Sequence, residues 1–204
     1  MSTALENPFR TSRLLSLPVH WAGIRPETLL ARWEAAGRRG ALVGTHGTGK
    51  TTRLRALAYR LVAEGWTVIW VQWHDDGTTT PDDWRATVRD AGPHTVLCLD
   101  GSENLGPISA YRLHRYTRSA GGVLTTRHRR SLLLPTLATY EPDAALFTAH
   151  AAILDQDARE AAMAAFAATG QNAHEAFRKL YFDYSRFSSR PIRAASASDG
   201  GLAA

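Results

Sequence analysis

Cysteine and long apolar runs are almost absent from this sequence. The 204 residues include a single cysteine, Cys98, which excludes a disulfide within the chain and favours a reducing compartment, the cytoplasm. No apolar stretch reaches the roughly 20 residues that a membrane-spanning helix needs. The first residues, MSTALENPFRTSR, lack the apolar centre of a signal peptide. We therefore expect one cytoplasmic domain, with room for a small appendage, that buries a core of its own.

Lysine is also rare compared with arginine. The chain has 24 lysines and arginines against 19 acidic residues, which gives a net charge of +5 and a pI of about 9.8. The positive residues gather in residues 111–118 and 127–130. Nucleic acid is thus a candidate partner, but the excess is modest and no motif that recognises nucleic acid is present. We favour a solvated basic face together with arginines that contact a nucleotide.

One segment has the pattern of a phosphate-binding loop. Residues 44–51 match G-x-x-x-x-G-K-T, the Walker A pattern, and the apolar residues 41–43 before them predict a buried strand. We call residues 44–52 the P-loop; its members are Gly44, Thr45, His46, Gly47, Thr48, Gly49, Lys50, Thr51 and Thr52. Glycines allow a tight turn whose amides converge on an anion at the start of a helix.

The P-loop pattern assigns a role to each of three side chains. Lys50 is expected to bridge the β- and γ-phosphates, the Thr51 hydroxyl to bind Mg²⁺, and Thr52 to lie on the α-phosphate side. A glycine-rich turn that binds nothing is the alternative. The strand before the loop and the helix pattern after it both favour the phosphate-binding interpretation.

The rest of the chain alternates strand and helix patterns. The predicted helices cover residues 26–39, 50–63, 82–90 and 107–119, and the predicted strands cover 66–73, 94–100, 122–126 and a short segment at 144–148, with a loop through Pro135. Two helical segments follow residue 150, and residues 191–204 are expected to be disordered. This order predicts an α/β P-loop NTPase sandwich with a mostly parallel sheet over residues 1–148 and a small helical segment over 149–190.

The strand at 94–100 ends in a carboxylate that complements the P-loop. Asp100 would emerge at the carboxyl edge of the sheet and help to hold Mg²⁺ with Thr51. Glu103, three residues later, is a candidate to polarise the water that attacks the γ-phosphate. Asn104 is an alternative water-orienting residue, and Glu103 could instead be a solvated acid at a helix start.

Two strand ends resemble known ATPase motifs. Residues 99–105, LDGSENL, resemble the Walker B segment of NACHT and related STAND ATPases, and residues 122–127, GVLTTR, are similar to the sensor 1 strand of the NB-ARC branch. In those families the arginine of Thr-Thr-Arg contacts the γ-phosphate. The resemblance therefore implies a catalytic or sensing role for Arg127, a function that suits a guanidinium group.

The C-terminal segment is similar to the sensor 2 helix of AAA+ ATPases. Residues 170–181, GQNAHEAFRKLY, have His174 where that motif has an arginine, and Arg178 lies one turn later. The simpler interpretation is an amphipathic helix that packs Phe177, Leu180 and Tyr181 on the core.

The chain as a whole resembles a group of short, uncharacterised bacterial P-loop ATP-binding proteins. The likeness rests on the Asn7-Pro8-Phe9 start, the P-loop, the Asp-Gly pair at 100–101 and the Leu-Pro-Thr-Leu segment at 134–137. It covers most of residues 7–185 and implies ATP and Mg²⁺ as ligands.

Three functions fit these patterns. The first is an AAA+/STAND-type ATPase or ATP-operated switch that acts on a separate protein or self-associates, with Arg112, Arg115 and Arg118 as candidate arginine fingers. The second is a small-molecule kinase with residues 127–135 as a lid and Trp70, Trp73 and His74 near the acceptor, although packing explains these tryptophans more simply. The third is a nucleic-acid-handling ATPase.

The resemblance to these ATPase families implies adenine as the base. The chain has no Asn-Lys-x-Asp segment that would select guanine, so a GTPase is not expected. His20 and Trp21 are candidates to stack on adenine, although Trp21 is more simply a core residue.

Overall fold

The structure is a computed structural model that describes residues 7–14, 16–74 and 76–188. In chain order its elements are α1 (Thr11–Leu14), α2 (Pro26–Ala35), β1 (Arg39–Gly44), α3 (Lys50–Ala63), β2 (Thr67–Trp73), β3 (Thr79–Thr80), α4 (Trp84–Arg89), β4 (Thr95–Asp100), η1 (Ser102–Asn104), α5 (Pro107–Tyr116), η2 (Thr117–Ser119), β5 (Gly122–Arg127), β6 (Thr136–Tyr140), α6 (Ala144–Leu154), η3 (Gln156–Ala158), α7 (Arg159–Ala168) and α8 (Ala173–Ser188). The tail expected to be disordered, residues 191–204, lies outside the described residues.

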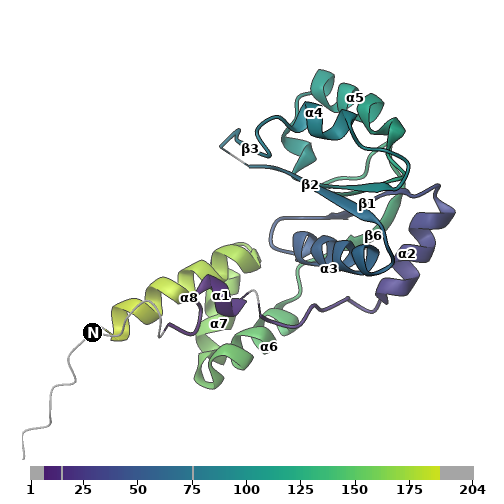
Figure 1. The fold of residues 1–204 in the computed structure, drawn as a ribbon. Coiled ribbons are helices and arrows are strands. Elements are labelled where there is room, and N and C mark those ends of the chain that lie inside the picture. Colours follow the sequence, from purple (N-terminus) through teal and green to yellow (C-terminus); the bar gives the residue numbers. More distant parts are fainter. Residues whose placement is uncertain (1–6, 15, 75, 189–204) are drawn as a thin grey trace, which may run out of the picture.

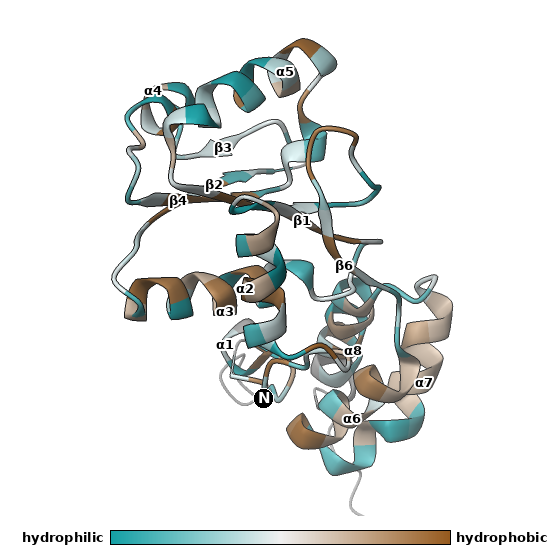
Figure 2. Ribbon diagram, turned by 90° about the vertical axis from the view of Figure 1, so that its right-hand side faces the viewer, coloured by the Kyte–Doolittle hydropathy of each residue, from teal (hydrophilic) through white to brown (hydrophobic). Residues whose placement is uncertain are grey.

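A six-stranded sheet forms the centre of the fold. Its strand order is β3-β2-β4-β5-β1-β6, and every pairing is parallel except that of β2 with the two-residue β3. Helices α4 and α5 cover one face, and α2 and α3 cover the other (Figures 1 and 2). The predicted α/β P-loop NTPase sandwich is confirmed.

Alternation along the buried strands divides the core between the two faces. On β4, Val96 and Cys98 pack with α2 and α3, whereas Leu97 and Leu99 pack with α4 and α5. Successive side chains of a strand point to opposite faces, so Asp100 belongs to the α3 face. The P-loop at the start of α3 lies on that same face.

Helices α6, α7 and α8 pack on one another beside the sheet (Figure 1). Their core contains a stacked pair, Phe147 and Phe166, whose ring centroids are 4.9 Å apart. Phe9 from the N-terminal segment is 3% exposed and belongs to the same cluster. The two helical segments predicted after residue 150 are present as α7 and α8. The division of the chain at residue 148 stays a prediction, and this position falls inside α6.

One prediction between residues 131 and 154 is wrong, and one strand there was not predicted. The expected strand at 144–148 is the first part of α6, because Asp143 caps this helix by accepting a 2.9 Å hydrogen bond from the Leu146 amide. An apolar run of five residues cannot distinguish a strand from a helix by itself. The strand at this point of the chain is β6, at residues 136–140, which pairs with β1 at the edge of the sheet.

Helix α2 is shorter than the predicted helix over residues 26–39. It ends at Ala35, since Gly37 and Arg38 have φ angles of +69° and +60°. These angles lie outside the helical range. Arg39 then begins β1. In the described part of the chain, none of the helices combines the length and apolar character that crossing a membrane requires.

Trp33 joins α2 to the sheet and is expected to contribute strongly to stability. Its side chain is 1% exposed, and its indole N–H donates a 3.0 Å hydrogen bond to the Val123 carbonyl. Replacing Trp33 by alanine should lower the free energy of unfolding by about 3–5 kcal/mol. Urea denaturation measures this change, and Val62→Ala on the exposed face of α3 is the control. Equal unfolding midpoints for the two variants would contradict this account of the α2 face.

Cys98 is expected to be inert in the folded protein. It is fully buried on β4, and burial, with a smaller effect of Asp100, raises the pKa of its thiol to about 12. A thiol reagent at pH 8 needs the thiolate and access to it. The native protein should therefore remain unlabelled, and the urea-unfolded protein should label fully. Rapid labelling under native conditions would show that β4 is exposed.

Candidate functional site

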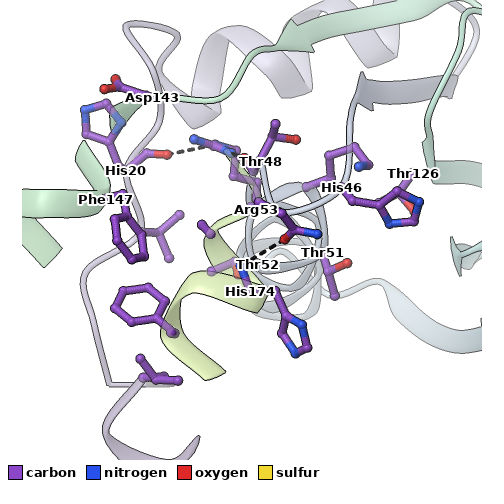
Figure 3. Close-up of a pocket in the computed structure, with 18 of the residues that line it drawn as sticks. His20, His46, Thr48, Thr51, Thr52, Arg53, Thr126, Asp143, Phe147 and His174 are labelled. Carbon is purple, nitrogen blue, oxygen red and sulfur yellow. Dashed lines mark hydrogen bonds between the residues drawn. The ribbon is translucent and has the colours of Figure 1, made fainter. Parts of the chain in front are cut away.

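A cavity of about 860 Å³ lies at the carboxyl end of the parallel strands. Its walls come from the N-terminal segment, the P-loop, the ends of β4 and β5, α6 and the start of α8. Figure 3 shows His46 and Thr126 at one end of this cavity and His20, Asp143 and Phe147 at the other. Ligands of open α/β sheets bind at this edge.

The P-loop forms a turn between β1 and α3. Gly47 and Gly49 both have φ of +75°, and α3 begins at Lys50, directly after the loop. Residues 46–52 line the cavity. The Lys50 ammonium donates a 2.7 Å hydrogen bond to the Thr45 carbonyl, so its charge lies over the loop. Burial lowers the pKa of Lys50, and the charges of Glu103 and Asp100 oppose this shift.

Asp100 lies beside the first turn of α3 and meets two hydroxyl groups. The Thr51 hydroxyl is 3.0 Å from each carboxylate oxygen, and the Thr126 hydroxyl donates a 2.6 Å hydrogen bond to Oδ1. Asp100 itself is 5% exposed. A hydroxyl and a carboxylate that converge in this way are oxygen ligands of the kind that Mg²⁺ prefers. Thr126 was not predicted as a site residue.

A turn after β4 brings Glu103 back to the cavity. Gly101 has φ of +74°, and a β-carbon there would lie 2.3 Å from the Trp73 carbonyl oxygen, so only glycine fits this turn. The Glu103 carboxylate pairs with His128, with 3.0 Å between Oε1 and Nε2. Its other oxygen, Oε2, is buried and has no hydrogen-bond partner among the described residues. The water-orienting alternative, Asn104, also lines the cavity.

Arg127 is not brought together with the other predicted catalytic residues. Along β5, Leu124 packs on the α3 face and Val123 packs on the α5 face, so alternation assigns Thr126 to the first and Arg127 to the second. Arg127 lines a separate cavity of about 70 Å³ together with residues of α5 and the loop at 131–134. His128, the next residue, lines the large cavity instead.

The start of α8 lies directly on the P-loop. A β-carbon at Gly47 would be 2.4 Å from Asn172 Oδ1 and 2.6 Å from the Ala173 amide nitrogen. Asn172 caps α8, since its Oδ1 accepts from the His174 amide at 3.1 Å. His174 is exposed and lines the cavity. Arg178 instead pairs with Glu175, at 3.0 Å.

The comparison with known families agrees with this geometry. A family model, Novel STAND NTPase 5, matches residues 26–131, just over half of the chain. The chain belongs to the Novel STAND NTPase 5 family. The matched region contains the P-loop, Asp100, Glu103 and His128, and family membership supports a nucleotide-binding, NTPase-type function in general. No curated protein matches the chain.

Arg53 is a buried residue of the family region that the sequence analysis missed. It is 4% exposed. Its guanidinium donates to the Thr48 carbonyl of the P-loop and, at 2.7 Å, to the His20 carbonyl, and it lies 4.1 Å from the centre of the Tyr140 ring. Arg53 precedes Leu57 and Leu61 by four and eight residues. The sequence signal that could have identified Arg53 is an arginine at a position of the predicted helix that shares its face with buried leucines.

The tryptophans considered for a kinase acceptor site have packing roles. Trp70 packs against the core under Arg55, with 5.5 Å between the guanidinium and the ring centre. Trp73 is 6% exposed and packs edge-on against Trp84, with ring centroids 5.2 Å apart. Trp21 likewise packs against the core formed with α2 and α3. Packing accounts for Trp70 and Trp21, whereas Trp73 also lines the large cavity.

Because Gly47 lies against the start of α8, adding a β-carbon at this position should disturb that contact. Gly47→Ala should separate the start of α8 from the P-loop and speed hydrogen exchange of the His174 and Glu175 amides. Gly65→Ala is a matched control, because Gly65 also has a positive φ, +92°, but nothing lies within 4 Å of a β-carbon there. Both variants carry a backbone cost of about 1–2 kcal/mol. Unchanged exchange at residues 173–176 in Gly47→Ala would contradict the contact.

Proposed function

We propose that this chain is an Mg²⁺-dependent ATP-binding protein that hydrolyses ATP. The observation that carries the proposal is the contact of the Thr51 hydroxyl with both Asp100 oxygens, 3.0 Å each, at the point where the P-loop becomes α3. The P-loop supplies amides for phosphate oxygens, and these two side chains supply metal ligands. The family match supports an NTPase-type activity, and ATP and Mg²⁺ are the finer assignments.

The triphosphate would bind along residues 44–52, with Lys50 released from the Thr45 carbonyl to contact the β- and γ-phosphates. Thr51 and Asp100 would hold Mg²⁺, and Thr126 would orient Asp100 by its hydrogen bond. When bound, the ion neutralises charge on the phosphate oxygens. Thr52 would contact the α-phosphate.

The base would lie at the opposite end of the cavity. This end is lined by apolar side chains, among them Val19, Leu146 and Phe147, together with His20 and His150. Burial lowers the pKa of His150, with smaller effects of His20 and Arg53 in the same direction, so the neutral ring is favoured. An apolar wall with neutral polar groups suits a nucleotide base, and His20 is the candidate to stack on adenine.

Hydrolysis would use Glu103. Its buried Oε2 has an unused acceptor position among the described residues, which suits the proton of an attacking water. The water oxygen bonds to the γ-phosphorus, the bond from phosphorus to the bridging oxygen breaks, and ADP and phosphate leave. Glu103 accepts the water proton.

The partner is proposed to be a separate protein or a second copy of this chain. Arg112, Arg115 and Arg118 lie exposed on α5 and the turn after it, where a neighbouring molecule could use them as arginine fingers. The buried, single Cys98 is consistent with the cytoplasm as the working compartment.

Lys50→Ala should weaken binding of Mg-ATP by about 10–100-fold, because it removes the charged donor to the phosphates. Isothermal titration calorimetry measures the dissociation constant. The chain offers a matched control, Lys179→Ala, since Lys179 is exposed on α8 and pairs with Asp183. Equal affinity in the two variants would refute phosphate binding at the P-loop.

Glu103→Gln should keep nucleotide affinity within about twofold and lower the rate of phosphate release by about 10²–10⁴-fold, since the amide cannot accept the proton. Single-turnover assays with labelled ATP measure the rate, and Glu64→Gln at the exposed end of α3 is the control. Normal turnover by Glu103→Gln would exclude this residue as the base. Hydrolysis that needs a small-molecule acceptor would instead indicate a kinase.

A further inference from the structure

His128 is the residue that connects the P-loop to Glu103. It follows the last residue of β5. Its Nδ1 lies 3.2 Å from the Gly44 carbonyl oxygen, and its Nε2 lies 3.0 Å from Glu103 Oε1. The ring also packs on His46, with centroids 3.8 Å apart and the planes tilted by 35°. The imidazole of His128 therefore contacts Gly44 and His46 of the P-loop and the candidate base, Glu103.

The contact with Glu103 leaves half of the carboxylate available. His128 occupies Oε1, while Oε2 is buried with no partner among the described residues. A carboxylate held by one oxygen presents the other in a defined direction. Without His128, the Glu103 side chain would have no described hydrogen-bond partner to orient it.

The charges around His128 make this bridge sensitive to phosphate. The charged groups that face the ring are Glu103, Lys50 and His46, together with the Gly44 carbonyl dipole. Burial lowers the pKa of His128, Lys50 and His46 lower it further, and Glu103 and Gly44 oppose them. A neutral ring has one N–H and can donate to only one of its two acceptors, whereas the doubly protonated ring donates to both. An anionic phosphate on the P-loop favours the doubly protonated ring.

We propose that His128 is a positioning residue that orients Glu103 through its Nε2 contact, while its Nδ1 contact joins it to the P-loop. This inference rests on the proposed ATPase function. It also gives His128 the role at the end of β5 that the NB-ARC resemblance assigns to Arg127. Arg127 points to the other face of the sheet, and its Nε is buried in the small cavity beside α5 with no partner in the described part of the chain.

Two substitutions separate the contacts of the ring. The amide nitrogen of glutamine can take the place of Nε2, so His128→Gln can still donate to Glu103. The amide of asparagine takes the place of Nδ1, so His128→Asn can donate to Gly44 but cannot reach Glu103. A role in folding or in shaping the P-loop would be preserved by asparagine, whereas a role in positioning Glu103 would be preserved by glutamine.

The experiment measures the Mg-ADP dissociation constant and the single-turnover rate of ATP hydrolysis for each variant. We expect affinity within about threefold of wild type in both, a rate lowered about 10–100-fold in His128→Asn, and a rate restored to within about fivefold in His128→Gln. His94→Asn, in the exposed turn before β4, is the control and should match wild type.

Each alternative outcome has a different meaning. Equal rates in His128→Asn and wild type would overturn the inference and leave the proposed function intact. Equal losses in both His128 variants would show that the ring acts structurally and would also overturn it. A greater loss in Arg127→Gln than in His128→Asn would return the role to Arg127. If wild type binds Mg-ADP but does not hydrolyse ATP, the hydrolytic part of the proposed function fails, and this inference fails with it.

Discussion

The contact between the Thr51 hydroxyl and the Asp100 carboxylate is the constraint on which the rest of the site depends. It joins the first turn of α3 to the end of β4, two segments 49 residues apart in sequence. Strand β5 lies between β1 and β4, and its residue Thr126 donates to the same carboxylate. The segments at the carboxyl ends of three neighbouring strands therefore meet at one buried carboxylate, that of Asp100. The P-loop, the candidate metal ligands and the candidate base are arranged around that point.

The two parts of this arrangement, the P-loop and the end of β4, could each be predicted from the sequence because each pattern is local. The P-loop pattern contains its own strand, turn and helix start, and β4 is an uninterrupted apolar run that ends in Asp100. The direction of Arg127 was also open to prediction. Alternation along β5 separates it from Thr126, whereas the resemblance to Thr-Thr-Arg gives a position in the sequence but not the face to which a side chain points.

The remainder depends on contacts between distant segments, which a sequence pattern does not contain. The apolar residues 144–148 fit a strand or a helix equally well, and the cap at Asp143 together with packing against α7 and α8 decided for the helix. Arg53 contacts the His20 carbonyl only because the N-terminal segment packs beside α3, whereas its contact with Thr48 is local. His128 is an ordinary member of a basic run until Glu103 and Gly44 surround it.

The N-terminal segment and the C-terminal helices are tied together as well as to the sheet. Phe9 lies inside the core of α6, α7 and α8, and the Asn7 side chain donates a 2.9 Å hydrogen bond to the Tyr181 carbonyl. The family match covers residues 26–131 and includes neither the N-terminal segment nor the C-terminal helices. A fragment trimmed to the matched region would keep the P-loop and lose the wall proposed to contact the base. On the proposed mode of binding, the smallest unit able to enclose a whole nucleotide would extend from Asn7 into α8, well beyond the region that the family model matches.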